Sequence, residues 1–226
     1  MIERFADGYR RWLLRKLPPG PLRDYCAVPL PRRAIDYRQI GYVALDFETT
    51  GLNPRRDHIL SLGWVVVENV CLLLGTAEHR IIRLDCDIPA ESAAIHRITD
   101  DQSATGETLN RALAALFATL TGRVLIVHHA SIERGFLAAT CRRLYGYPPP
   151  LRIIDTEVVA RRVLDRRQII YQASELRLHA LAERYNLPRL NAHNALSDAI
   201  VTAELFLAQT AYQDAGRGFP LGDLLC

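Results

Sequence analysis

Two acidic side chains, Asp46 and Glu48, end an apolar stretch in which residues 44–48 read A-L-D-F-E. Because side chains alternate along a β-strand, both carboxylates would face the same side of such a strand. Two carboxylates held side by side repel unless a cation lies between them. Oxygen ligands of this kind suit Mg²⁺ or Mn²⁺. The alternative is a frayed strand end at which both acids are simply exposed to solvent.

A second group of polar side chains occurs where residues 128–133 read H-H-A-S-I-E. Ser131 suits a helix N-cap, and Glu133 would then lie in the first helical turn, where a carboxylate is favoured in any case. Glu133 is therefore either a site residue or an ordinary residue of a helix start. The adjacent His128 and His129 suggest zinc, but no third ligand at helical spacing supports a zinc site.

The third group is His193 and Asp198, in the segment H-N-A-L-S-D-A over residues 193–199. We expect His193 on the loop before the last helix and Asp198 in the first turn of that helix. This separation lets both side chains meet at one end of a sheet. A histidine beside an activated water acts as a general base near neutral pH. Asp198 alone could equally serve to stabilise the helix start.

The elements that must position these residues begin with strands and continue with alternating helices and strands. Three strands with short connections predict antiparallel neighbours. The whole pattern predicts an α/β fold, a mixed sheet of about five strands, three antiparallel and then parallel, flanked by helices. The expected strands are 42–47, 59–67, 70–85 in pieces, 124–127 and 152–154, and the expected helices are 2–17, 108–121, 132–144, 155–164, 176–185 and 196–210.

Composition describes an ordinary globular protein. The 226 residues are 49% hydrophobic and 23% charged, which excludes collagen, a coiled coil and a disordered chain. The longest apolar run, residues 59–74, contains Glu68 and Asn69 and is shorter than the roughly 20 residues that span a bilayer, so no membrane association is expected. Five scattered cysteines without a C-x-x-C pair favour the reducing cytoplasm.

Charge and proline content divide the chain into three segments: an N-terminal arm over residues 1–40, a globular body over 41–212 and a tail over 213–226. Residues 1–41 hold nine basic and four acidic side chains, although the whole chain carries only +3. A basic, proline-rich arm suits nucleic acid or an acidic partner, or is a solvated helix and linker. The apolar stretch 219–225 of the tail would dock on a partner or pack on the body.

Taken together and in this order, three segments resemble the motifs of the DEDDh 3′–5′ exonucleases, the DnaQ-like relatives of the proofreading epsilon subunit within the ribonuclease H-like superfamily. They are D-F-E-T-T-G-L at 46–52, H-H-A-S-I-E at 128–133 and H-N-A-L-S-D-A at 193–199. The likeness covers residues 41–209 and includes I-H-R-I-T at 95–99, similar to the family's I-H-G-I-T. Two positions differ, because the family carries Asp in place of Glu133 and usually Asn in place of His129.

The resemblance implies a site for two metal ions, Mg²⁺ or Mn²⁺. Asp46 would bridge the two ions, Glu48 and Asp198 would complete the first, and Glu133 would support the second. His193 would take a proton from the attacking water. Since the additional methylene of Glu133 moves its carboxylate by ~1.5 Å, slow turnover or a preference for Mn²⁺ is expected. The residues matched to substrate contacts are Thr49, Thr50, Leu52, His96, Ile98, His128 and His129.

The expected function is therefore a metal-dependent 3′–5′ exonuclease that releases nucleoside 5′-monophosphates. Single-stranded DNA or frayed and mismatched 3′ ends are favoured as substrates, in DNA proofreading or repair. A DNA polymerase or a repair factor is the corresponding partner. Two alternatives stay open: a 3′–5′ exoribonuclease, and a catalytically weakened module that binds nucleic acid as a scaffold.

Overall fold

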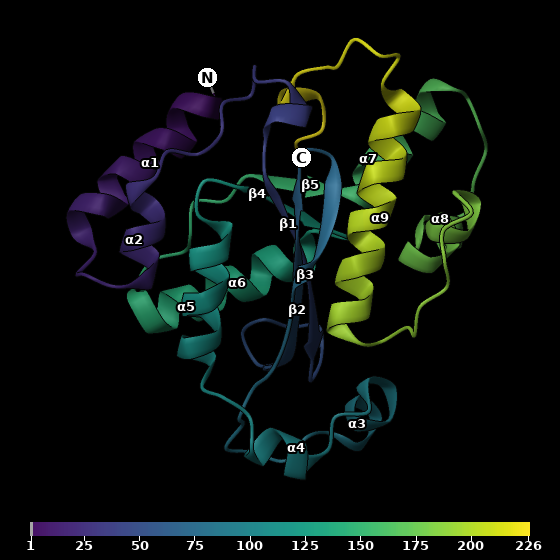
Figure 1. Cartoon of the computed structure of the whole chain (residues 1–226). Helices are drawn as coiled ribbons and strands as arrows, with labels where there is room; N and C mark the ends of the chain where they lie inside the picture. The colour runs from purple at the N-terminus through teal and green to yellow at the C-terminus, as the bar shows by residue number, and fades with distance from the viewer. Residues whose placement is uncertain (1) are drawn as a thin grey trace.

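Apolar and β-branched residues build the sheet that carries the site. In the computed structural model, which describes residues 2–226 and the side chains from residue 6 onward, the sheet has the order β3-β2-β1-β4-β5 (Figure 1). Antiparallel pairing joins the first three strands, and β4 and β5 run parallel to β1. This confirms the predicted mixed sheet. The strands are β1 (Tyr42–Thr49), β2 (Ile59–Glu68), β3 (Cys71–Ile81), β4 (Val124–Val127) and β5 (Ile153–Asp155).

Helices cover both faces of the sheet, and the alternation of β1 side chains assigns one core to each face. Val43, Leu45 and Phe47 pack toward α5 (Leu109–Leu120) and α6 (Ser131–Tyr145). Tyr42 and Ala44 pack toward α7 (Thr156–Arg166) and α9 (Ala195–Gln213), with α8 (Leu178–Arg184) beyond them (Figure 1). Asp46 and Glu48 continue the alternation of Tyr42 and Ala44, so they lie on the α9 side.

Two short helices, α3 (Ala90–His96) and α4 (Asp100–Ala104), lie beyond the carboxyl end of β1, apart from the other helices (Figure 1). The sequence analysis expected a strand in pieces as far as residue 85 and did not predict these helices; β3 ends at Ile81. A capping box between Thr99 and Gln102 opens α4. Ile88 and Ile98 pack with Leu60 in a small core of their own, which holds this unit against the sheet.

The N-terminal arm packs on the body as two helices, α1 (Ile2–Lys16) and α2 (Pro21–Ala27). Leu13, Leu22 and Tyr25 are buried in the same core as α5 and α6, and the Tyr25 hydroxyl donates to the carbonyl of Pro150 at 2.7 Å. The tail also packs on the body, with Leu221 and Leu224 in the core beneath α9. Three 3₁₀ turns complete the chain: η1 (Tyr37–Gln39), η2 (Ala173–Leu176) and η3 (Leu221–Asp223).

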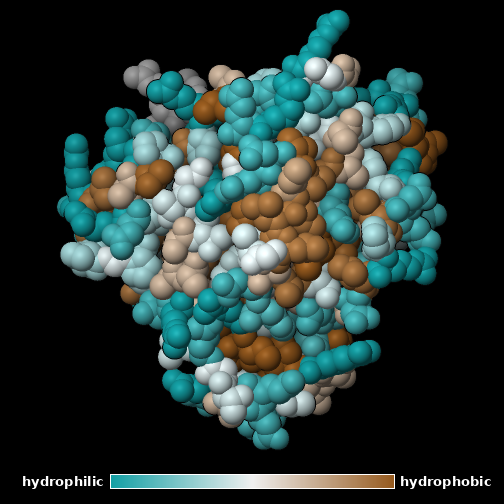
Figure 2. Space-filling view, in the orientation of Figure 1, coloured by the Kyte–Doolittle hydropathy of each residue, from teal (hydrophilic) through white to brown (hydrophobic). Residues whose placement is uncertain are grey.

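The two edges of the sheet differ. A bridge from Leu225 to Ile154 covers part of β5, whereas β3 is an open edge on which Leu74 is 60% exposed. Apolar side chains gather in the middle of the face on which β3 lies beside α9 (Figure 2). Over residues 2–226 the structure contains no helix with the length and apolar character needed to cross a membrane.

Candidate active site

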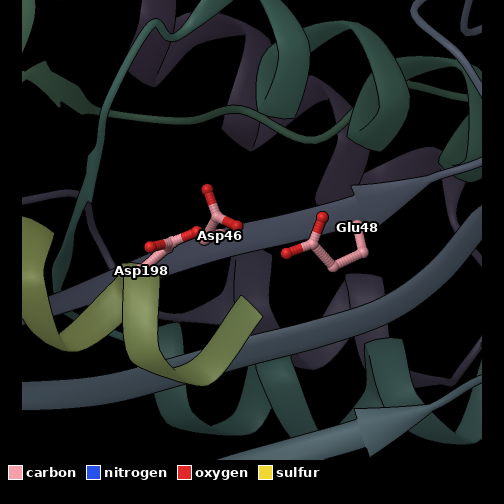
Figure 3. A group of neighbouring side chains, drawn as sticks. All are labelled: Asp46, Glu48 and Asp198. Carbon is pink, nitrogen blue, oxygen red and sulfur yellow. The ribbon is translucent and has the colours of Figure 1, made fainter. Parts of the chain in front are cut away.

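Three carboxylates converge at the carboxyl end of β1. Asp46 and Glu48 lie on one face of the strand, as predicted, and Asp198 reaches them from the first turn of α9 (Figure 3). One oxygen atom from each side chain lies within 4.8 Å of those from the other two. Burial, followed by the charges of Glu133, Glu48 and Asp198, raises the pKa of Asp46 well above its ordinary value.

Unsatisfied oxygen atoms at this cluster fit a divalent cation. Glu48 Oε1 and Glu133 Oε2 are buried and accept no hydrogen bond within the described part of the chain. Asp198 Oδ1 is also buried, and the ring of His179 lies against it with Nε2 at 3.1 Å. Buried polar atoms nearly always have partners, so these buried carboxylate oxygens call for a positive charge. Oxygen-only donors of this kind match Mg²⁺ and Mn²⁺.

A close approach between β2 and α9 brings Asp198 to the strand. Gly63 pairs with Asp46 in the sheet, and a Cβ at Gly63 would lie only 2.2 Å from the backbone of Ala195 and Leu196. The absence of a side chain there lets α9 begin directly over β2. Asn194 caps the helix by accepting a hydrogen bond from the Ser197 amide at 3.1 Å.

His193 lies at the edge of the carboxylate cluster. Its backbone is left-handed, with φ of 61°, and its amide donates to Asp198 Oδ2 at 3.0 Å. The ring faces that of His96 edge-on, with centroids 6.4 Å apart. His96 Nδ1 also contacts the carboxylate of Glu48. His193, His96 and Ile98 line a cavity of about 250 Å³, so residues from two distant segments meet beside the acids as the sequence predicts.

Glu133 lies in the first turn of α6, as predicted, and only 2% of it is exposed. Burial is the main cause that raises its pKa to about 8, and the charge of Asp155 adds to the shift. Its charge raises the pKa of Asp46 in turn, so Glu133 is a fourth acid that acts on Asp46. The expected N-cap at Ser131 is wrong: Ala130 occupies that position and provides no side-chain cap.

Asp155 explains why α6 needs no side-chain cap of its own. Its carboxylate accepts hydrogen bonds from the amides of His129 at 3.1 Å and Ala130 at 2.8 Å. It also caps α7 through the amides of Glu157 and Val158. One buried side chain thus fixes the loop that leads to Glu133. The position of Asp155 between an expected strand and an expected helix indicates an N-cap. Its hydrogen bonds to the loop before α6 cannot be predicted from the sequence.

The two adjacent histidines are held by α7. His128 Nδ1 lies 2.8 Å from Thr156 Oγ1, and His129 Nδ1 lies 2.8 Å from Glu157 Oε2. His129 has φ of 66°, a conformation in which asparagine is enriched. The side chain of His129 is 59% exposed, so it is accessible from solvent.

The loop after β1 supplies the other residues matched to substrate contacts. Thr49 Oγ1 donates to the carbonyl of Gly51 at 2.7 Å, and Thr50 Oγ1 accepts from the His58 amide at 2.9 Å. These bonds order the turn, and Leu52 stands on it 78% exposed. His179 of α8 was not predicted from the sequence, and its Nε2 lies 3.1 Å from Asp198 Oδ1. No spacing signal relates His179 to the other site residues.

Comparison with known proteins identifies the family to which this sequence is similar. The sequence model of the family RNase_T, described as "Exonuclease", matches residues 43–206. The chain is 28% identical over 166 residues to a PolC-type DNA polymerase III of Thermotoga petrophila, covering 74% of this chain but only 12% of that protein. It is also 28% identical over 185 residues to the DNA polymerase III subunit epsilon of Treponema pallidum, covering 80% of this chain and 82% of that protein.

Solved structures show the same fold. Exonuclease X in complex with 5′ overhanging duplex DNA superposes with a TM-score of 0.61 at 23% identity, covering 81% of this chain and 98% of that one. The nuclease domain of 3′hExo, described as a DEDDh family member bound to rAMP, superposes with a TM-score of 0.66 at 17% identity, covering 80% and 96%.

Proposed function

This chain belongs to the exonuclease family, and we propose that it is a metal-dependent enzyme that removes nucleotides from the 3′ end of single-stranded or frayed DNA, releasing nucleoside 5′-monophosphates. The observation that carries the proposal is the meeting of Asp46, Glu48 and Asp198, three carboxylates whose oxygen atoms lie within 4.8 Å of one another, with His193 bonded to Asp198 through its amide.

In this proposal each acid has a defined task. Asp46, Glu48 and Asp198 would hold one divalent cation, and Glu133 would contribute to a second. Such cations, when bound, neutralise charge on a phosphodiester and make a nearby water more acidic. His193 accepts the proton of the attacking water, since its ring borders the cavity next to the acids. His96 orients Glu48 through their contact.

DNA is the proposed substrate because both relatives compared by sequence are named as DNA polymerase III proteins. The chain spans most of the epsilon subunit of Treponema pallidum, which supports a DNA polymerase or a repair factor as partner. The five cysteines are all free thiols, in keeping with work in the reducing cytoplasm.

The test uses a 5′-labelled single-stranded DNA oligonucleotide with a free 3′ hydroxyl, incubated with Mg²⁺, Mn²⁺ or EDTA. We expect a ladder that shortens from the 3′ end with either metal and is absent in EDTA. Asp46→Asn keeps the shape of the side chain and removes its charge, so this variant should lose the ladder. Degradation of RNA alone would instead identify an exoribonuclease. Binding of nucleic acid without hydrolysis of either polymer would identify a scaffold module.

A further inference from the structure

A second cavity, of about 590 Å³, lies on the α5 and α6 side of the sheet, beside the loop that follows β1. Most of its lining comes from three segments: the loop 54–59, the segment 82–86 that follows β3, and the C-terminal half of α6. Each wall contributes one arginine, and these are Arg55, Arg83 and Arg143. Three guanidinium groups from separate parts of the chain thus surround one hollow.

These arginines are available to a ligand. All three are exposed, and none forms an ion pair with any acid whose side chain the structure describes, residues 6–226. Nearby Arg80 is different, because Glu78 and Glu107 hold it at 2.8 and 2.9 Å. Arg80 thereby engages Glu78 and Glu107 and leaves neither as the main partner of the three arginines.

Two acids also line the cavity, and they leave an excess of positive charge. The carboxylate of Asp57 closes its own loop by accepting from the Asn53 amide at 2.7 Å. Asp85 is exposed on the opposite wall. With three arginines against these two carboxylates, the lining favours an anion of modest charge over a cation.

The position of the cavity relates it to the carboxylates. Pro54 at its edge packs on Gly135 of α6, where an added Cβ would lie 3.2 Å from the ring. Glu133 is two residues before Gly135, and Arg143 is ten residues after Glu133, about 15 Å along the helix. The exposed Leu52 stands on the loop between the two places. A strand whose 3′ end lies at the acids would cross this loop to reach the arginines.

We propose that this cavity binds a backbone phosphate of the nucleic acid a few nucleotides upstream of the cleaved bond. The proposal rests on the proposed function, which places the 3′ end at Asp46, Glu48 and Asp198. Guanidinium groups pair with phosphate oxygens in a fork-like geometry and do so regardless of base sequence. The site therefore adds affinity for longer strands without adding sequence preference.

The test compares Arg143→Gln and the double variant Arg55→Gln/Arg143→Gln with the unaltered protein. Binding of a twelve-nucleotide single strand is measured by fluorescence anisotropy with Ca²⁺ over a range of salt concentrations. We expect the slope of log affinity against log salt to become shallower by about one for each arginine removed. KM for the same strand should rise, whereas hydrolysis of a dinucleotide, which cannot reach the cavity, should stay unchanged.

Arg142→Gln is the matched control, because it removes the same charge from the next residue of α6. Arg142 is exposed and its charge acts on Tyr9 of α1, on a different side of the helix. An unchanged salt slope in the double variant, or an equal change in Arg142→Gln, would overturn the proposal. So would an equal loss on the dinucleotide, since this would indicate damage to the site of hydrolysis.

A second measurement alters the substrate in place of the protein. Single methylphosphonate linkages, which lack the negative charge, are introduced at successive positions of the twelve-nucleotide strand. The unaltered protein should lose affinity at one or two upstream positions, and the double variant should be insensitive there. Uniform losses at every position would contradict the proposal. This measurement of binding does not depend on turnover. A failure of hydrolysis therefore counts against the proposed function. The same dependence of affinity on methylphosphonate position in both proteins counts against the arginine site.

Discussion

Glu133 is the acid at which this sequence differs from the exonuclease motifs that it resembles. It is buried, its Oε2 accepts no hydrogen bond among the described residues, and its pKa is raised to about 8. The side chain is one methylene longer than the aspartate that the family carries. A longer side chain moves the carboxylate toward or past the place at which a second cation would be held.

Replacing Glu133 by aspartate tests this geometry. We expect Glu133→Asp to raise the ratio of activity in Mg²⁺ to activity in Mn²⁺ by on the order of tenfold or more, since a misplacement of about 1 Å can cost about 10²-fold in rate. Glu133→Gln, which keeps the length and removes the charge, should lose activity with both metals. The measurement is kcat on a single-stranded oligonucleotide in each metal. A metal ratio that is the same in Glu133→Asp as in the unaltered protein would contradict this account.

The same carboxylates predict how stability depends on pH in the absence of metal. Burial raises the pKa values of Asp46 and Glu133, so the folded chain retains protons that the unfolded chain has released. Stability is then fully present below the ordinary carboxyl value of about 4.5 and is lost as pH rises toward about 8.

We therefore expect the free energy of unfolding in EDTA to fall between these limits, by up to about 1.4 kcal/mol per pH unit for each retained proton. Urea titrations at a series of pH values measure it. Glu133→Gln should flatten the dependence, and saturating Mn²⁺ should remove or reverse it. If the free energy of unfolding in EDTA instead rose with pH over this range, the charges of the buried acids would already be balanced within the folded chain.

Sequence reasoning reached Asp46, Glu48, His193 and Asp198 because each lies at a strand end or helix start with a recognisable spacing. It did not reach His179, since this residue meets Asp198 only through the packing of α8 on α9. Asp155 was recognised only as a helix start. Its bonds to the His129 and Ala130 amides arise because β4 and β5 are parallel neighbours, so the segments that follow them meet at one edge.

At the scale of elements, the contact between β2 and α9 sets the geometry of the site. Gly63 lies in the strand opposite Asp46, and α9 begins directly over it. A sequence pattern identifies the strand and the helix separately. It does not reveal that the absence of one side chain sets the distance between them.

Gly63→Ala should therefore damage both stability and activity. The new Cβ would meet backbone atoms at 2.2 Å, so α9 must shift and take His193 and Asp198 with it. Overpacking of this kind typically costs about 1–3 kcal/mol, and the displaced acid should reduce activity by on the order of 10²-fold. Urea unfolding and kcat measure the two effects.

Gly75→Ala is the control, because a Cβ at Gly75 in β3 meets nothing within 4 Å. This variant should change neither quantity appreciably. If Gly63→Ala left both stability and activity at the level of Gly75→Ala, the close approach would not govern the site.

Local sequence patterns located some elements of the fold, and tertiary packing determines the others. All five strands were located within a few residues, because their apolar runs are long or bounded by clear turns. Helices α3 and α4 were missed, because residues 90–104 are polar and short of apolar periodicity. They are held by Ile88 and Ile98 against Leu60, a contact that exists only in the folded chain. Helix α2 was also missed, because the prolines around it predicted an irregular connector, whereas Pro21 lies at the helix start, where proline is tolerated.

At the scale of the whole molecule, the basic N-terminal arm is part of the core. Leu13, Leu22 and Tyr25 pack with residues of α5, although the proline-rich sequence suggested an appendage. The division of the chain at residue 40 stays a prediction, and the packing gives it a clear test. Removing these helices would expose the apolar face of α5 to water.

Deleting residues 1–40 should lower stability markedly, because fully burying a leucine contributes about 1.5–3 kcal/mol and several large side chains would be lost. Thermal unfolding measures this effect. Replacing the exposed Arg11 and Arg15 by glutamine should leave stability nearly unchanged and so isolates the contribution of charge. Reduced affinity for nucleic acid in this charge variant would assign the arm a binding role. If the deletion melted at the temperature of the full chain, the arm would be an appendage after all.

The position of Asp198 on the last long helix has a consequence for biosynthesis. Asp46 and Glu48 come from the first strand, so the three acids are far apart along the chain and meet only after α9 has docked on β2. Domains fold as the ribosome releases them, from the N-terminus onward. A nascent chain that has formed β1, β2 and β3 therefore still lacks Asp198, one of the three carboxylates proposed to hold a cation. Asp198 is synthesised long after Asp46 and Glu48. The three carboxylates are therefore not yet assembled while the polypeptide leaves the ribosome, close to messenger and ribosomal RNA.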